Sequence, residues 1–510
     1  MAAEEEPKQR RVSQACDACK RRKVRCNGQQ RCQQCNHLDL KCIYSTGKRA
    51  HARRITAERG AVIAEYRKNT SSHYSQSSPT PLSPAPSQAV PSPSQAVPSP
   101  TSLSLPPISP HPHPQYFLDL IPDYLASVYP VNPVITEAEI RNCVQQINSS
   151  REAASFLYAF AAVTINLTRS DLLQLAPDIQ DQITGLVNRC LEFQDPMGAD
   201  SQPTLLKVMS NIFIEISLMG LSKPRLGFFY LRQAISLLHM LRVENATEMA
   251  LLDPVERARR QRAYWECFIH ERFTALSENM PICLPPLPNL PEHDPSLLPE
   301  IEQGWILIIR TFTLIDAEFV ELWNGDRSRV TSEFIEQKHR ELQDDQWQME
   351  VSMLSPMQQA DLIITRQWLR TLVWQLAMSN ILLSSEASSE PLALTFPLRL
   401  SSQLRQFLTQ MSRESVAIHG TGILSKLFEI TDTFADVVIH LPQASTEDTL
   451  QRVDDILFLK RFIFSFPRIQ SVHKRILMQK FEKMKEVYPN LEEIEHLVNS
   501  PLSISSGNVG

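Results

Sequence analysis

Apolar residues recur at helical spacing over most of the chain beyond about residue 115. Apolar side chains at every third or fourth position build one face of an amphipathic helix, whereas a half-buried strand alternates apolar and polar residues. Strand-like alternation is scarce, so the pattern predicts one all-α domain of antiparallel helices over residues 115–498. The expected helices lie near residues 136–147, 151–167, 170–194, 204–220, 225–242, 254–278, 301–323, 357–384, 398–413, 422–441 and 447–487, and some should break in two.

Three local signals add detail to this helical pattern. Thr136 and Glu139 in TEAE have the spacing of a capping box, which opens a helix that runs to about Ile147. Residues 283–300, CLPPLPNLPEHDPSLLPE, predict a long proline-rich loop within the domain. The stretch SFLYAFAAVTINL predicts a buried helix, and it is shorter than the roughly 18 apolar residues that a membrane span needs. We therefore expect no contact with a membrane.

A change of composition separates this domain from the start of the sequence. Residues 69–114 contain no Asp, Glu, Lys or Arg, are dense in serine and proline, and include two successive copies of SQAVPSP. Such a segment cannot bury a core and predicts a disordered linker. Residues 499–510 are likewise expected to form a disordered tail. Residues 1–15 form a tail of mixed charge that lacks the apolar stretch of a signal peptide.

The net charge of −5 combines a basic head with an acidic remainder. Residues 1–68 hold 17 Lys and Arg against 7 Asp and Glu, a net of +10, which leaves −15 for the rest of the chain. This division favours a nucleic-acid-binding module joined to a domain that does not itself touch DNA.

Six of the ten cysteines crowd into residues 16–42. A disulfide framework would suit a secreted domain, which the start of this sequence does not indicate, and the basic sequence between the cysteines argues against core thiols. Two matching halves, each of the form Cys-x2-Cys-x6-Cys, instead predict metal binding, since zinc prefers four soft ligands in a tetrahedron. Two tetrahedra need eight ligand positions, so six cysteines suffice if one thiolate from each half bridges two ions. The cysteines are Cys16, Cys19, Cys26, Cys32, Cys35 and Cys42.

Basic residues mark the first half of this array as the side that faces DNA. Arg and Lys are the side chains that reach guanine O6 and N7 in the major groove. The second half has a mixed sequence, which indicates a scaffold, and we interpret its His37 as a surface residue. The basic residues of the first half are Lys20, Arg21, Arg22, Lys23 and Arg25. A second basic group contacts phosphates or directs nuclear import, and it comprises Lys48, Arg49, Arg53 and Arg54.

Residues 43–68 are interpreted as a basic linker with a short helix. Ile55, Val62 and Tyr66 share one side of that helix, which makes a homodimer one hypothesis. The segment is too short to pair two chains firmly, so the helical domain is the expected source of association.

The cysteine array and its basic run resemble the fungal Zn2Cys6 binuclear-cluster transcription factors. The resemblance implies two zinc ions per chain, with Cys16 and Cys32 bridging them. Cys19 and Cys26 would complete the first zinc site, and Cys35 and Cys42 the second. Arg31 stands where the family often has proline, and Asn27-Gly28 can still turn this loop.

The same resemblance implies how DNA is read. The base contacts would come from Arg22 and Lys23 on a CGG-type triplet of double-stranded DNA, in the nucleus. The function it implies is that of a transcription factor of RNA polymerase II genes.

Residues 256–281, ERARRQRAYWECFIHERFTALSENMP, resemble the regulatory middle-homology domain of these factors. FTLIDAEFVELWNG and TRQWLRTLVWQLAMSN are similar to the maltose- and sucrose-utilisation activators. This implies a pathway-specific activator that recruits transcriptional co-regulators to a sugar-utilisation or secondary-metabolite gene set. A repressor with the same reading of DNA is the alternative. From the residues alone, AYWECFIHERF is an amphipathic core helix, and Trp265, Phe268 and Phe273 are expected in the core rather than in a ligand site. The arginines that precede it are expected on exposed or carboxylate-facing sides, and they are Arg257, Arg259, Arg260 and Arg262.

An enzyme is the competing class of function. HGTG at residues 419–422 is faintly similar to an oxyanion loop, but the sequence has no GxSxG elbow, HExxH motif, phosphate loop or dinucleotide fingerprint. We interpret HGTG as a turn between helices and expect no enzymatic activity. The remaining cysteines are expected to be buried thiols, and they are Cys143, Cys190, Cys267 and Cys283.

Overall fold

The computed structural model divides the chain into two compact units, residues 1–104 and 105–510, each described here by itself. The unit at residues 105–510 is called the helical body below. Predictions for residues 1–15, 43–110 and 489–510, including the basic group at residues 48–54, lie outside the described residues. The described residues are 16, 26–32, 42, 111–169, 177–195, 198, 200–325, 327–343, 345–380, 382–384, 389–440 and 446–488.

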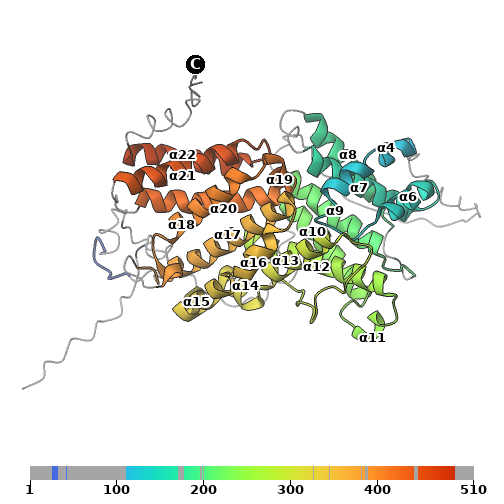
Figure 1. Ribbon diagram of the computed structural model, residues 1–510, viewed down its shortest axis with the longest axis horizontal. Coiled ribbons are helices and arrows are strands. Elements are labelled where there is room, and N and C mark those ends of the chain that lie inside the picture. Colours follow the sequence, from blue (N-terminus) through green and yellow to red (C-terminus); the bar gives the residue numbers. More distant parts are fainter. Residues whose placement is uncertain are drawn as a thin grey trace, which may run out of the picture. The chain divides into compact units, whose positions relative to one another are not determined.

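Regular structure in the described part of the helical body is helical, with one isolated bridge between Ser384 and Ala393 (Figure 1). The all-α prediction is therefore confirmed. No helix in the described ranges is both long and apolar enough to cross a bilayer.

Capping residues explain where several helices begin. At Thr136 the capping box is present: its backbone N–H donates to Glu139 Oε2 over 2.9 Å, and its side chain accepts from the Glu139 N–H. Asp253 and Ser355 cap helices that open on proline, a residue that suits the first helical turn because its missing N–H would have no partner there. These short-range signals mark where the helices begin.

The first group of helices surrounds α7. Residues 153–167 of this helix are buried on every side, as expected for a helix that is apolar all round. It packs between α8 and α9, and α9 packs along α10. The helices of this group are α4 (Pro114–Leu118), α5 (Ile121–Ser127), α6 (Glu137–Gln146), α7 (Arg151–Thr168), α8 (Pro177–Phe193), α9 (Leu205–Gly220), α10 (Pro224–Met240) and α11 (Ala246–Met249).

The second group is built around α20, which packs on α17, α18, α21 and α22 (Figure 1). The long helix α12 (Pro254–Glu278) joins the two groups, since it contacts α9 and α10 of the first and α13 and α14 of the second. The helices of the second group are α13 (Pro299–Thr313), α14 (Ala317–Asn324), α15 (Ser332–Glu341), α16 (Asp345–Ser352), α17 (Pro356–Ser379), α18 (Phe396–Gln410), α19 (Arg413–Ala417), α20 (Gly420–His440), α21 (Thr446–Phe464) and α22 (Ser471–Val487). Two single turns of 3-10 helix, η1 (Arg327–Arg329) and η2 (Glu390–Leu392), complete it.

Two of the predicted helical stretches break in two, as was expected for some of them. The stretch 301–323 is two helices, because the Asp316 side chain accepts a hydrogen bond from the Phe319 N–H and starts α14. The stretch 447–487 also divides, into α21 and α22, around Pro467. Several short helices, such as α15 and α16, were not predicted.

The proline-rich segment is a loop, as predicted, and buried ion pairs hold it to α12. Arg262 Nη2 lies 2.8 Å from Asp294 Oδ2, and both side chains are almost fully buried. Glu271, which is 0% exposed, accepts hydrogen bonds from the backbone N–H groups of Cys283 and Leu284. It also pairs with the guanidinium of Arg272 at 2.8 Å. Buried charged side chains of α12 therefore determine the path of this loop.

A second buried contact joins the two helix groups over a long sequence distance. Arg468 Nη1, in the segment after α21, donates to the backbone oxygen of Asn166 in α7 over 2.8 Å. Gly220 lies against this contact, and a Cβ there would come within 2.2 Å of the Asn166 side-chain oxygen. A larger residue at this position would require the Asn166 and Arg468 side chains to shift.

Candidate functional site

Four of the six clustered cysteines are described, and three of them converge. The Sγ atoms of Cys16, Cys26 and Cys32 all lie within 4.8 Å of one another, and all three residues are buried. The Sγ atoms of Cys16 and Cys32 are 3.7 Å apart. The backbone N–H of Cys32 donates to Cys42 Sγ over 3.2 Å, which brings a fourth sulfur to the cluster.

These distances fit zinc ligation and do not fit disulfides. A disulfide joins its sulfurs at about 2.05 Å, whereas two thiolates on one zinc tetrahedron, with Zn–S about 2.3 Å, lie about 3.8 Å apart. All eight described cysteines are free thiols. The cluster is therefore a donor set suited to zinc, which supplies the cross-links that a module with so few apolar residues lacks.

Burial distinguishes the two cysteines that the resemblance assigns as bridges. Cys16 and Cys32 are 0% exposed, whereas Cys26 is 8% exposed and Cys42 is half-buried. A bridging thiolate faces two ions and is expected to lie deepest. Their bridging role stays a prediction, because Cys19 and Cys35 lie outside the described residues.

The loop between the two halves turns where the sequence predicted. Gly28 has a φ of 73°, in the left-handed region that favours glycine, and Asn27 Nδ2 donates to Gln29 Oε1 over 3.0 Å. Arg31 is exposed in this loop. The predicted DNA-contacting residues 20–23 and 25 lie outside the described residues.

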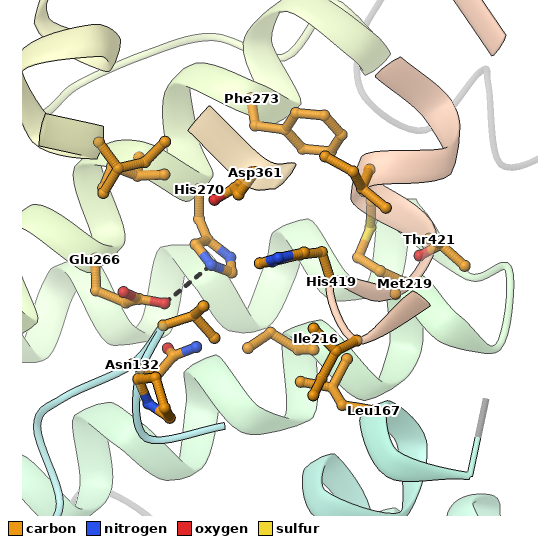
Figure 2. Close-up of a pocket in the computed structure, with 18 of the residues that line it drawn as sticks. Asn132, Leu167, Ile216, Met219, Glu266, His270, Phe273, Asp361, His419 and Thr421 are labelled. Atoms are coloured by element: carbon orange, nitrogen blue, oxygen red, sulfur yellow. Dashed lines mark ion pairs between the residues drawn. The ribbon is translucent and has the colours of Figure 1, made fainter. Parts of the chain in front are cut away.

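The helical body contains a second candidate site, a cavity of about 180 Å³. Six helices line it (α7, α9, α12, α13, α17 and α20) together with residues 130–132. In Figure 2 the side chains of Asn132, Glu266, His270, Asp361 and His419 point toward the same space.

Charged groups inside this cavity are paired with one another. His270 Nδ1 lies 2.7 Å from Glu215 Oε2, and His270 Nε2 lies 3.1 Å from Glu266 Oε1 (Figure 2 shows the second pair). Burial alone would lower the pKa of His270, but the two carboxylates raise it well above its usual value. Lys426 Nζ donates to Thr365 Oγ1 over 2.6 Å and lies 3.4 Å from Asp361 Oδ1.

His419, directly before α20, adds another polar side chain to the cavity lining. His419 Nε2 contacts the backbone oxygen of Met357 over 2.9 Å, and burial lowers the pKa of this imidazole although Asp361 opposes the shift. The HGTG motif covers the turn before α20 and its first residues, with Gly420 at a φ of 65°. The motif was predicted to be a turn, and it also lines the cavity.

Sequence reasoning did not predict this cavity. The sequence feature that could have indicated it is a charged residue inside an otherwise apolar helix, such as Glu215 in α9 or Lys426 in α20. Trp265 and Phe268 are buried core residues, as expected, whereas Phe273 lines the cavity. The α12 arginines face carboxylates, as predicted, and Arg262 is buried.

One prediction about the remaining cysteines was wrong. Cys143, Cys190 and Cys267 are buried, and burial raises the pKa of the first two thiols to about 12. Cys283 is exposed, because it lies at the start of the proline-rich loop and contacts Arg232 at the surface.

Comparison with known proteins agrees with the geometry of the cysteine cluster. Residues 14–51 match the fungal Zn(2)-Cys(6) binuclear cluster domain. The chain is 19% identical to the probable sucrose utilization protein SUC1 of Candida albicans over 72% of each chain. It is 21% identical to the maltose fermentation regulatory protein MAL13 of Saccharomyces cerevisiae over 84% of this chain and 85% of that one. Over 40 residues, 8% of this chain and 6% of the relative, it is 52% identical to the fumonisin cluster-specific transcription factor FUM21 of Gibberella moniliformis.

Residues 14–51 therefore form a fungal Zn(2)-Cys(6) binuclear cluster domain, which binds two zinc ions, and the predicted resemblance of the cysteine array is confirmed. The relatives of the chain include regulators of sugar utilisation, as well as a transcription factor named as specific for the fumonisin cluster.

Proposed function

We propose that this protein is a nuclear, sequence-specific transcription factor of RNA polymerase II genes that reads CGG-type triplets. The observation that carries the proposal is the convergence of the cluster sulfurs within a segment that matches the zinc domain. Six cysteines hold the metal, and the basic run of residues 20–25 faces the major groove. Residues 48–54 contact phosphates or direct import.

Base reading is assigned to Arg22 and Lys23. Lys23→Ala or Arg22→Ala is expected to remove discrimination at the triplet, at about 1–3 kcal/mol per lost guanine contact. Arg53→Ala is the matched control, since loss of a phosphate contact weakens binding to all sequences alike and flattens the salt dependence. Selection from randomised DNA measures both effects. An unchanged preferred motif for Lys23→Ala would contradict the assignment.

A second prediction concerns which part of the chain holds two zinc modules together on DNA. One triplet is too little sequence to select a promoter within a genome, so selectivity needs two zinc modules or a partner protein. A chain truncated after residue 114 is expected to bind single triplets weakly and to activate no reporter. The full-length protein is expected to bind paired triplets more tightly, which titration on one- and two-triplet DNA measures. Equal affinity of both chains for paired sites would assign dimerisation to residues 55–68.

Activation of a metabolic gene set is the direction of control that we propose, with repression as the alternative. Two relatives whose names concern sucrose or maltose align over 72–84% of this chain, including the helical body, which favours sugar utilisation over a secondary-metabolite cluster. Genome-wide mapping of bound sites tests this, together with expression of the neighbouring genes when the factor is deleted. The aligned relatives are regulators, which supports a protein that is not an enzyme.

A further inference from the structure

The first helix group carries a surface groove that shares no residue with the cavity described above. Residues of α7, α8, α9 and α10 line this groove, and its volume is about 620 Å³. Phe229 is 51% exposed and Met240 is 48% exposed, although both are large apolar side chains of one helix. Exposed apolar side chains that gather in one place mark a site of association. The large apolar residues of the lining are Leu191, Phe193, Phe229, Leu237 and Met240.

Each charged residue that lines this groove has a partner of opposite charge within the helical body. The ion pairs are Lys207 with Glu152 at 3.8 Å, Arg232 with Glu271 at 2.9 Å, and Asp195 with Arg151 at 2.5 Å. A charged group that entered the groove would therefore lose its hydration without gaining a counter-charge, which is costly. The groove favours an occupant that is apolar and carries no charge.

The described part of the helical body begins beside this groove. His111 is its first residue, and the ring of His111 lies 4.7 Å from the ring of Phe193, which lines the groove. His111 Nδ1 also contacts the hydroxyl of Tyr158 over 3.1 Å. These two contacts hold His111 at the end of α8, so the residues directly before it start next to the groove.

The sequence directly before His111 has the composition that such a groove accepts. Residues 105–110 read LPPISP and carry no charge. Proline-rich sequences favour the polyproline II conformation, whose three residues per turn place Leu105 and Ile108 on one side. Grooves lined by aromatic residues bind this conformation at little cost in conformational entropy. At about 3.1 Å per residue the segment spans about 19 Å, close to the roughly 17 Å of helix between Phe229 and Met240.

We propose that residues 105–110 dock in this groove as an extended, proline-rich segment of the same chain. Leu105 and Ile108 pack against the apolar side chains of α10, and docking ties the end of the linker to that helix. The proposal concerns the helical body and the segment attached to it, and it does not depend on the reading of DNA. Its failure would therefore leave the proposed function in place.

The test is photo-crosslinking in the full-length, zinc-loaded protein. The photoreactive residue p-benzoylphenylalanine replaces Phe229, which keeps an aromatic ring at this position, and mass spectrometry identifies the cross-linked peptides. We expect cross-links to residues 105–110, and a mixture of isotopically labelled and unlabelled protein should show that they lie within one chain. The same replacement at Met378, which is also 51% exposed but does not line the groove, should give no cross-link to these residues.

Matched variants of the linker, made in the protein with the photoreactive residue at position 229, locate the docked segment. Leu105→Asp and Ile108→Asp each replace an apolar side chain by a carboxylate. Each is expected to lower the equilibrium constant for docking about 10-fold or more, the effect of burying one such side chain, and the cross-link yield should fall with it. Val97→Asp places the same charge in the linker outside the segment, and the yield should be unchanged.

Three results would overturn the proposal. They are no cross-link between position 229 and residues 105–110, cross-links to these residues that join two different chains, and equal yields for Ile108→Asp and Val97→Asp. Cross-links from position 229 mainly to another segment of the chain would assign the groove to that segment instead. Far-ultraviolet circular dichroism verifies that each variant is folded before it is irradiated.

Discussion

Removal of zinc from the full-length protein is expected to abolish binding to triplet DNA while leaving the helical body folded. Residues 16–42 contain few apolar side chains, so metal ligation supplies most of the free energy that folds this module. The helical body has a hydrophobic core of its own, and none of its described residues belongs to the cysteine cluster. Native mass spectrometry should find two zinc ions per chain, and circular dichroism after chelation should retain the helical signal.

Cysteine variants provide the control for this experiment. Cys16→Ser removes a sulfur of the cluster and is expected to lower the zinc content and abolish DNA binding. Cys283→Ser removes an exposed thiol of the helical body and should change neither. A single zinc ion per chain, or three disulfides without zinc, would exclude the binuclear cluster.

Neutralising Glu271 is expected to destabilise the helical body by about 3–5 kcal/mol. Its carboxylate is fully buried, pairs with Arg272 and Arg232, and accepts two backbone N–H groups of the proline-rich loop. Glu271→Gln leaves the Arg272 guanidinium buried without a counter-charge and places an amide N–H₂ among donors. The midpoint of urea unfolding, followed by circular dichroism, measures the loss.

Glu256→Gln is the matched control on the same helix. Glu256 forms ion pairs with Arg259 and Arg260 but is partly exposed, so its loss should cost under about 1 kcal/mol. Similar unfolding midpoints for the two variants would show that the Glu271 network contributes little to stability.

The all-α fold was predictable because helix signals are local. A capping pair such as Thr136 and Glu139 acts within four residues, and an apolar stripe is visible along one helix. The course of the loop after α12 was not predictable, since it depends on Arg262 meeting Asp294 and on Glu271 meeting backbone N–H groups 12 and 13 residues later. Nothing in the spacing of these residues indicates that their charges are buried.

The two candidate sites differ in the same way. The metal centre was predictable because its predicted ligands are six cysteines within residues 16–42, and their spacing is part of the chemistry. The cavity combines residues from 130 to 426, and no short motif describes it. A lone acidic residue in an apolar helix, such as Glu215, shows only that a partner exists, and the fold decides that the partner is His270.

The contact between Arg468 and Asn166 cannot form until the ribosome has synthesised the whole segment between these two residues. The two residues are 302 positions apart, and at roughly 5–20 residues per second the ribosome needs roughly 15–60 s to travel between them. During that interval α7 and then Gly220 are made, but the guanidinium that completes their packing does not yet exist. The two helix groups can therefore complete this contact only after Arg468 has been synthesised.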